Sequence, residues 1–507
     1  MRSSIHHTRL AFALAVLLAG PVSAQITGVE VPEMAHYDTA VQDVFDDYDI
    51  PGGVVAVVKD GRLVYARGFG LAVVDAAEAV EPDARFRVAS ISKPITAMAV
   101  MKLVEDGALA LDEPAFALLP DLPPPAGQSE DPRLADVTIR DLLQHSGGWD
   151  RDGTGYDPMF DVVAIANALG ITPPADDEAV IRYMRGRPLD FDPGTRYSYS
   201  NFGYAVLGAI VTRVAGQPYE DYVRDLLAEA GATQMEPGRS LLEDRLPGEV
   251  RYYEYNGATT PSVFPPHALV PWPYGGFYLE AMDAHGGWVT SAPDLLRFME
   301  AIDGRPFRPD VLSPQSIAAM TARPNLPDWQ GTSYWYGLGL LVNAFNNWWH
   351  DGSLPGTRAY VIRTQFQNLS YCVITNTRPE PENGFLNALD VALWDAAVAT
   401  NPWPTHDLFG LYTAAEPAPT PASFTLSAAP NPFAGHTTLT LTLDAPQPVR
   451  IAVFDALGRR VAVLHDGEMA AGTHRLRLDA AGLPGGAYLV RASGAAGAVS
   501  RQVTVLR

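Results

Sequence analysis

Ser90 and Lys93 stand three residues apart at the start of an apolar stretch that runs to Gly107. Apolar residues recur there at helical spacing, and glycine tolerates the positive φ of a helix C-terminus, so the stretch predicts one amphipathic helix. Positions i and i+3 share a helix face, which brings the Lys93 amine to the Ser90 hydroxyl. Serine needs a neighbouring base to become a nucleophile, and a helix N-terminus favours developing negative charge. The pair therefore indicates acyl transfer.

The Ser-x-x-Lys spacing is weak evidence when it stands alone. The chain has three lysines, and with serine at ordinary abundance such a pair arises by chance roughly one time in eight. The alternative is a plain helix start, in which Ser92 is the N-cap and Lys93 lies in solvent. Other parts of the chain have to decide between the two.

Composition bounds the class of protein. The chain has 507 residues, 47% of them hydrophobic, which is enough for two or three domains with real cores. A net charge of −22 argues against nucleic acid or an anionic membrane surface as a partner. Cys372 is the only cysteine, so neither an intrachain disulfide nor a thiolate metal cluster is expected. Neither a His-Glu-x-x-His nor a P-loop pattern occurs, and we predict no cofactor and no metal.

The first residues have the pattern of a secretory signal peptide. Arg2 and Arg9 precede an apolar run at 10–20, and Pro-Val-Ser-Ala stands before Gln25. We predict a signal peptide over 1–24, with a retained anchor as the alternative. The apolar run is too short for a membrane span, and no later stretch is apolar for long enough to cross a bilayer.

The order of the predicted elements suggests one sheet built from both ends of a module. Residues 54–70 read as a hairpin around Asp60-Gly61, and β-like runs return over 334–376 before a final helix at 385–399. Between them lie mainly helical segments and an Asp-, Gly- and Pro-rich insertion, 149–186, that we expect to wall a cleft. A helical lobe inserted into a sheet places that cleft where the lobes meet.

The C-terminal part has a different texture. A Pro-rich linker is predicted over 413–422 and a small all-β domain over 423–507, where alternating runs are divided by Gly, Asp and Pro turns. The preceding module then covers 25–412.

Three motifs stand in order: Ser90-Ile-Ser-Lys93, Tyr199-Ser-Asn201 and His350-Asp-Gly352. In this order they resemble the serine β-lactamase, D-Ala-D-Ala carboxypeptidase and family VIII esterase superfamily, in its class C-like branch. The resemblance implies a two-lobe α/β fold, with an antiparallel sheet flanked by helices plus a helical lobe. The chain has one Tyr-x-Asn, whereas His-x-Gly also begins at other histidines; His350 is chosen because β-like runs flank it late in the module.

The resemblance also implies residue roles. Ser90 attacks a carbonyl to give an acyl-enzyme, and Lys93 and Tyr199 share the base work as a coupled pair in which ammonium and phenolate favour one another. Which of the two takes the serine proton stays open. The backbone N–H groups of Ser90 and Ser353 form the oxyanion hole. The remaining implied site residues orient the substrate amide or the lysine, line the pocket beside the leaving group and complete the third motif; they are Asn201, His350 and Gly352.

Plainer interpretations stand beside these roles. Asn201 can instead be a loop-to-helix cap, and His350 a satisfied strand-edge histidine. A further group of aromatic residues is expected either to line an apolar acyl pocket or to belong to the core: Trp149, Trp288, Trp335 and Trp349.

One departure from the family pattern bears on the substrate. Many members carry Lys-Thr-Gly where this chain has His350-Asp-Gly, and loss of that fixed cation weakens recognition of a substrate carboxylate. We therefore predict a secreted serine hydrolase whose small-molecule substrate is a carboxylic ester or a D-amino-acid peptide, with ester favoured. The alternatives are a penicillin-binding D-Ala-D-Ala carboxypeptidase, a weak β-lactamase, a slow-turnover acylated binding protein, and a surface adhesin with an inert enzyme-like module.

The tail resembles the C-terminal sorting domain of type IX secretion cargo. The residues that carry this likeness are Ala429-Pro-Asn-Pro-Phe433, Val453-Phe-Asp-Ala-Leu-Gly458, Gly472-Thr-His-Arg and Gly486-Ala-Tyr-Leu-Val. It implies the type IX secretion machinery as a partner, with passage through the periplasm and across the outer membrane to the cell surface or the exterior. A carbohydrate-binding or adhesive β-sandwich is the alternative.

Overall fold

The computed structural model describes residues 26–412, 425–443, 447–454, 460–494 and 497–506. The chain forms two compact units, divided after Thr413. The predicted signal peptide (1–24) and the predicted linker (413–422) lie outside the described residues.

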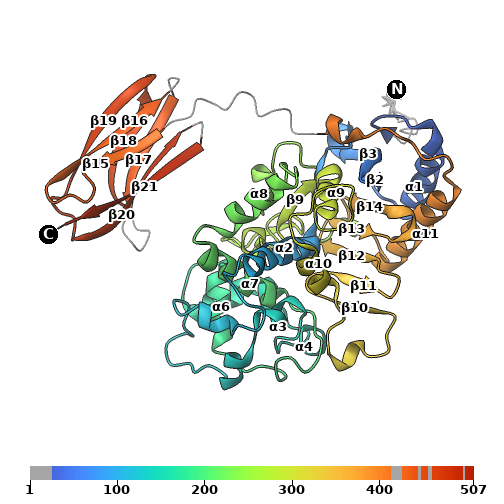
Figure 1. Ribbon diagram of the computed structural model, residues 1–507, viewed down its shortest axis with the longest axis horizontal. Coiled ribbons are helices and arrows are strands. Elements are labelled where there is room, and N and C mark those ends of the chain that lie inside the picture. Colours follow the sequence, from blue (N-terminus) through green and yellow to red (C-terminus); the bar gives the residue numbers. More distant parts are fainter. Residues whose placement is uncertain (1–25, 413–424, 444–446, 455–459, 495–496, 507) are drawn as a thin grey trace, which may run out of the picture. The chain divides into compact units, whose positions relative to one another are not determined.

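One antiparallel sheet joins the two ends of the first unit (Figure 1). Its order is β1-β3-β2-β14-β13-β12-β11-β10, with β4 added to β3, and the pairing of β2 with β14 joins the early strands to the late ones. This confirms the sheet predicted from both ends. The strands are β1 (Ile26–Thr27), β2 (Gly52–Lys59), β3 (Arg62–Val73), β4 (Glu78–Ala79), β10 (Tyr334–Tyr336), β11 (Leu341–Asn343), β12 (Trp348–Leu354), β13 (Thr357–Arg363) and β14 (Leu369–Thr375).

The hairpin of β2 and β3 turns at Asp60 and Gly61, whose φ angles are both positive, at 50° and 73°. A two-residue turn of this hand matches the twist of the strands, and Asp-Gly suits it. The sequence prediction of this hairpin is confirmed.

Strand β2 reads as a continuous apolar run because both faces of the sheet are covered. Val55 and Val57 pack into one core with α1 (Ala35–Asp47) and α11 (Glu382–Ala399), while Val54 and Val58 pack into the other. Successive strand residues point to opposite faces, so each core takes alternate residues. The second core contains α9 (Ala292–Glu300), α2 (Ser92–Glu105) and the helical lobe.

Helix α2 is not the amphipathic helix that the spacing predicts. Every residue from Ser92 to Met101 is buried, because the helix lies inside the second core, where neighbours surround it. It also begins two residues later than the nucleophile motif suggests. Ser90 belongs to a preceding 3-10 turn, η3 (Ala89–Ile91).

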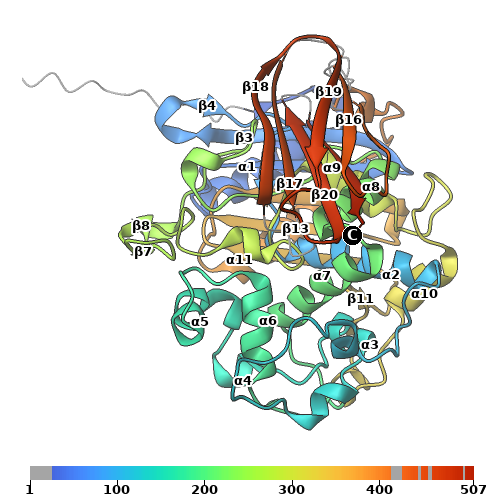
Figure 2. The same cartoon turned by 90° about the vertical axis from the view of Figure 1, so that its left-hand side faces the viewer.

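The helical lobe gathers at the end of the unit away from β3 (Figures 1 and 2). The insertion 149–186 folds into part of it, including the predicted helix near 162–169. The helices are α3 (Ile139–Leu143), α4 (Arg151–Thr154), α5 (Val162–Leu169), α6 (Asp177–Arg185), α7 (Asn201–Ala215), α8 (Tyr219–Glu229) and, beside α2, α10 (Pro314–Thr321). Small sheets join β5 (Arg85–Arg87), β9 (Trp288–Ser291) and β6 (Glu236–Pro237), and β7 (Thr259–Pro261) with β8 (Leu269–Pro271).

The second unit is all-β in its described residues, as predicted. Two sheets, β15-β16-β19 and β18-β17-β20-β21, enclose a core that includes Leu439, Ile451 and Val490. The strands are β15 (Thr425–Ala429), β16 (His436–Leu443), β17 (Gln447–Phe454), β18 (Arg460–Met469), β19 (Gly472–Asp479), β20 (Gly486–Gly494) and β21 (Gly497–Val505). Among the described helices of both units, none has the length and apolar character of a membrane span.

Candidate active site

The turn that carries Ser90 is held in a strained form. Ala89, just before it, has a φ of 47°, a left-handed conformation that a residue with a Cβ rarely adopts. Ala89 is fully buried in a small cluster with Phe277 and Leu354, among others, so the surrounding packing fixes this conformation. Strained backbone of this kind is typical of functional sites, and it leaves Ser90 partly exposed.

Gly352 is required by the close approach of β12 to this turn. A Cβ on Gly352 would lie 2.1 Å from the backbone oxygen of Val88, which neither backbone can avoid without moving. The glycine of the third motif thus allows β12 to run beside the nucleophile turn and to bring Ser353 into the same cleft as Ser90.

Lys93 is fully buried, and its amine has three oxygen neighbours. Nζ lies 3.3 Å from Ser90 Oγ, 2.7 Å from Asn201 Oδ1 and 2.8 Å from the backbone oxygen of His285. The alternative of a solvated lysine is therefore wrong. Ser92 is not the N-cap either, because its hydroxyl donates to the Ala89 carbonyl and accepts from the Trp288 backbone N–H.

The protonation of Lys93 follows from burial and from its partners. Burial lowers the pKa of Lys93 well below its usual value, which favours the neutral amine. The Asn201 and His285 oxygens can only accept, so they take the two N–H groups of that amine. The lone pair is left for the Ser90 hydroxyl.

Tyr199 lines the same cleft as Ser90, and its ring centroid lies 4.6 Å from Lys93 Nζ. Burial raises the pKa of Tyr199 well above its usual value, so the phenol keeps its proton. The sequence predicted an ammonium and a phenolate that favour one another. Burial instead drives both groups to their neutral forms.

Asn201 is the first residue of α7, and Ser200 is the N-cap, since its hydroxyl accepts from the Gly203 backbone N–H. Ser200, and not Asn201, is therefore the cap of this helix. The Asn201 amide donates through Nδ2 to Asp157 Oδ2 at 2.6 Å, while its Oδ1 accepts from Lys93. Both ends of the amide are fixed, and Asp157 is a site residue that sequence reasoning missed. Its one signal was its place in the insertion predicted to wall the cleft.

His350 lies in β12, where it pairs with Val361 of β13, while the pairing of β12 with β11 covers the two residues before it. Its Nδ1 donates to the Asp351 backbone oxygen at 2.6 Å, because a carbonyl can only accept, and Nε2 then accepts from the Tyr336 hydroxyl at 3.0 Å. Burial lowers the pKa of His350 to about 4, so the imidazole is neutral at pH 7. The satisfied-histidine interpretation is confirmed, and the same ring also lines the cleft.

These groups surround a cleft of about 370 Å³ between the sheet and the helical lobe. Four predicted site residues line it, and Lys93 and Asn201 lie directly behind Ser90. The lining residues are Ser90, Arg151, Asp152, Tyr197, Tyr199, Tyr336, Leu341, His350, Asp351 and Ser353. Four tryptophans were expected either at an acyl pocket or in the core; none belongs to this described lining, and Trp288 is fully buried in the core.

Comparison with known proteins identifies the family to which the chain belongs. The family model described as Beta-lactamase matches residues 37–393. The chain belongs to the β-lactamase family. Esterase EstB of Burkholderia gladioli is 32% identical over 397 residues, which cover 72% of this chain and 95% of the esterase. Because the chain belongs to this family and is similar to an esterase over most of its length, it is a serine hydrolase.

Solved structures share the fold. The octameric penicillin-binding protein homologue from Pyrococcus abyssi matches with a TM-score of 0.56 and 22% identity, over 93% of this chain and 96% of that one. The D-amino acid amidase from Ochrobactrum anthropi SV3 matches with a TM-score of 0.54 and 23% identity, over 71% and 99%. The tail, residues 427–506, matches the model for a secretion system C-terminal sorting domain, which supports export to the cell surface or beyond.

The cleft of this β-lactamase-family protein contains a guanidinium that sequence reasoning missed. Arg151 lies 4.7 Å over the Tyr199 ring and pairs with Asp152 at 2.9 Å. His350 supplies no positive charge, so Arg151 is the cation among the residues described as lining the cleft. Asp351, on the other wall, pairs with Arg358 at 2.7 Å.

A third missed residue, His145, supports the tyrosines of the site. It is buried, its Nδ1 accepts from the Ser200 backbone N–H at 3.1 Å, and its ring centroid lies 4.3 Å from that of Tyr199 and 4.6 Å from that of Tyr336. In the sequence it is only one of several His-x-Gly starts. Among the described residues, no cluster of His, Cys, Asp and Glu has the arrangement of a metal site.

Proposed function

We propose that the protein is a secreted hydrolase that forms an acyl-enzyme at Ser90 and cleaves carboxylic esters. The observation that carries this proposal is the buried amine of Lys93, 3.3 Å from Ser90 Oγ, with its other two hydrogen bonds directed to oxygens that can only accept. Distances of this size are common before substrate binds and shorten in the reacting complex.

Lys93 is the general base in this proposal. As Ser90 Oγ attacks the ester carbonyl carbon, its proton passes to the Lys93 lone pair. Tyr199, which keeps its proton, donates to the leaving alcohol oxygen as the ester C–O bond breaks, and regains a proton from the Lys93 ammonium. The oxyanion lies between the backbone N–H groups of Ser90 and Ser353. Water then attacks the acyl-enzyme with the same base, which releases the acid.

Esters are favoured by the lack of a positive charge at the third motif. An ester needs no cation for recognition, and the place of the family's lysine is taken by His350, whose lowered pKa keeps it uncharged. The relative from Burkholderia gladioli, 95% of whose length the match covers, is named an esterase.

Hydrolysis of D-amino-acid peptides is the second candidate function. The observation that favours it is Arg151, because a guanidinium lining the cleft can bind a peptide carboxylate in place of the lost lysine. A slow-turnover penicillin-binding protein or weak β-lactamase would use the same contact. In that case mass spectrometry would find a persistent adduct on Ser90 after a β-lactam has been removed.

The export route is part of the proposal. The predicted signal peptide over 1–24 directs the chain to the periplasm, and the sorting domain carries it across the outer membrane through the type IX machinery. Deletion of residues 427–507 is expected to leave the protein in the periplasm, as cell fractionation would show. Secretion of the shortened chain into the medium would refute this route.

The test of the reaction is hydrolysis of p-nitrophenyl butyrate by the secreted full chain and by Ser90→Ala. We expect kcat to fall by at least about 10³-fold in the variant. Ser333→Ala is the matched control, since Ser333 is exposed and lies outside the described cleft lining. Equal rates in all three proteins, or no turnover in any, would refute the ester hydrolase.

A further inference from the structure

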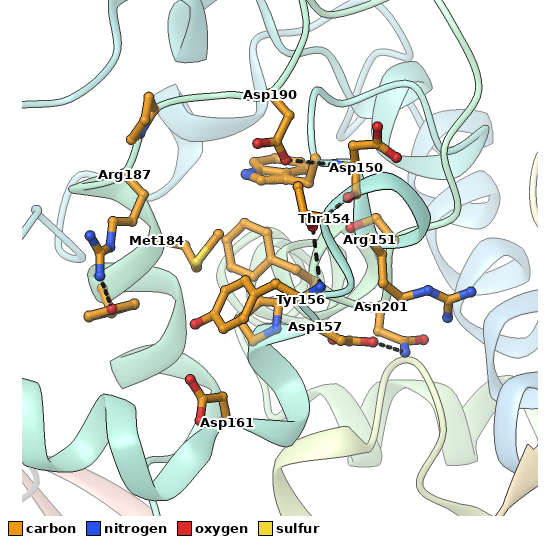
Figure 3. A pocket seen from close by; sticks show the side chains of 16 residues that line it. Asp150, Arg151, Thr154, Tyr156, Asp157, Asp161, Met184, Arg187, Asp190 and Asn201 are labelled. Atoms are coloured by element: carbon orange, nitrogen blue, oxygen red, sulfur yellow. Dashed lines mark hydrogen bonds between the residues drawn. The ribbon is translucent and has the colours of Figure 1, made fainter.

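A second cavity, of about 450 Å³, lies beside the Ser90 cleft within the helical lobe (Figure 3). Its walls come from the insertion around α4, the end of α6 with the loop after it, and the start of α7. Among the described residues, Arg151 is the one shared by the two linings. The catalytic proposal gives this cavity no role.

One part of the cavity wall is apolar and aromatic. Trp149 and Phe202 meet edge to face with centroids 4.7 Å apart, and Met184 and Tyr156 extend this surface. The Trp149 side chain is buried and belongs to the hydrophobic core, so this part of the wall is firmly packed.

Four charged residues of this lining form no ion pair within the part of the chain that the structure describes: Arg187, Asp157, Asp161 and Asp190. Arg187 donates to the Tyr183 hydroxyl and lies 4.7 Å over its ring, and burial together with the nearby Asp161 carboxylate raises the pKa of the Tyr156 phenol. Figure 3 shows Arg187, the Tyr156 hydroxyl and Asp161 toward the same side of the cavity.

Beyond Arg187 and Asp161, the charged groups of the lining already have partners. Asp150 pairs with Arg196 at 2.7 Å and Arg151 with Asp152 at 2.9 Å. Asp157 accepts from Asn201 at 2.6 Å, and Asp190 accepts from the Asp150 backbone N–H at 2.8 Å. An occupant that meets the Arg187 guanidinium and the Asp161 carboxylate, next to an aromatic wall, carries both charges on a small apolar body.

We propose that this cavity binds a free amino acid with an apolar side chain. Its carboxylate pairs with Arg187, its ammonium pairs with Asp161, and its side chain packs against Trp149, Met184 and Phe202. Charge-assisted hydrogen bonds at the two ends fix the orientation, and the apolar contact supplies the remaining affinity.

The cavity also has a direct connection to the base of the proposed reaction. Asp157 and Asn201 belong to its lining, and their hydrogen bond continues from Asn201 to Lys93 at 2.7 Å and from Lys93 to Ser90 at 3.3 Å. An occupant therefore touches the two residues that orient the lysine from behind, while the Ser90 cleft stays open. We expect occupancy to change kcat with little effect on KM. This coupling rests on the proposed function, whereas binding does not.

The test is calorimetric titration of the full chain carrying Ser90→Ala with four probes: D-phenylalanine, L-phenylalanine, 2-phenylethylamine and 3-phenylpropanoate. One or both phenylalanine enantiomers are expected to bind with a stoichiometry of one, and the two probes that lack one charge at least about tenfold more weakly. Asp161→Asn and Arg187→Gln are each expected to weaken phenylalanine binding by at least about tenfold. The controls Asp136→Asn and Arg182→Gln, outside the described lining, should change nothing.

Kinetics with the wild-type chain separate this site from the Ser90 cleft. Phenylalanine is expected to change kcat for p-nitrophenyl butyrate, and the effect is lost in Asp161→Asn, which keeps its basal rate. Purely competitive inhibition, no binding of either enantiomer, or equal binding of 2-phenylethylamine would each overturn the proposal. Failure of the ester hydrolase proposal would show separately, as absence of turnover in a chain that still binds phenylalanine in the titration.

Discussion

The two cavities on either side of Asn201 differ in where their charged groups lie. At Ser90, burial favours the neutral forms of Lys93, Tyr199 and His350, and Arg151 is the cation of the described cleft lining. In the neighbouring cavity, Arg187 is exposed and Asp161 partly so, and neither has an ion-pair partner in the described chain. Burial thus favours an uncharged base beside the nucleophile, whereas exposed charged groups are available to hold a ligand in the second cavity.

Lys93→Met is expected to have the largest effect, because it removes the proposed base and keeps the volume. We expect kcat for p-nitrophenyl butyrate to fall by at least about 10³-fold. The melting temperature should stay equal or rise, since a buried amine is costly and methionine is not. Lys102→Met, on the same helix but paired with Asp106 at 3.0 Å near the surface, is the control. Retained turnover in Lys93→Met would show that Lys93 is not the base and would point to Tyr199 instead.

Gly352→Ala tests whether the cleft depends on the close approach of β12. The added Cβ meets the Val88 oxygen at 2.1 Å, so the strand or the Ser90 turn has to shift. We expect about 10²-fold loss of kcat and a destabilisation of about 1–3 kcal/mol in urea unfolding. Gly410→Ala, with no atom within 4 Å of its added Cβ, is expected to leave both unchanged. A fully active Gly352→Ala would show that the approach is not needed.

Asp157→Asn probes the connection between the two cavities. Asp157 accepts from both Asn201 and the Met159 backbone N–H, and an amide can accept through one end only. We expect kcat to fall about tenfold with KM unchanged, because Asn201 loses its fixed orientation and Lys93 loses a partner. Asp157→Ala should fall further, and the exposed Asp136→Asn should match wild type. An altered KM with unchanged kcat would place Asp157 in substrate binding instead.

The sequence predicted the parts of this molecule that local patterns determine. The β2–β3 hairpin follows from Asp60-Gly61, the sheet follows from strands at both ends, and the order of the three motifs predicted that Ser90, Tyr199 and His350 share a cleft. The resemblance to a known family then indicated which roles these three motif residues have. These features depend on spacing and on residue type, which the chain displays directly.

The rest depends on contacts between distant segments. Asp157 lies 44 positions before Asn201, and nothing in the spacing says which carboxylate of the insertion reaches the amide. Arg151 and His145 join the site for the same reason. The neutral state of Lys93 could not be predicted, because α2 was expected to be amphipathic and burial on all sides decides its pKa. The sequence left four tryptophans either at an acyl pocket or in the core, and three-dimensional packing decides between the two; the large aromatic residues of the described cleft lining are tyrosines.

The smallest effect concerns the pH dependence of stability, and it tests whether His350 is neutral in the folded chain. The pKa of His350 is lowered to about 4 by burial, and those of His145 and His285 are also lowered. Through these histidines the unfolded chain binds more protons than the folded one, so their contribution to stability is complete above the unfolded pKa of about 6.5 and is lost as pH falls from there toward 4. Carboxyls whose pKa is raised by burial, such as that of Asp310 to about 6 and that of Glu300 to about 7, act in the opposite direction over this range. The test therefore compares two proteins: between pH 6.5 and 4 the urea midpoint of the wild-type chain should change less favourably than that of His350→Gln. An equal change in the two proteins would contradict a neutral His350 in the folded chain.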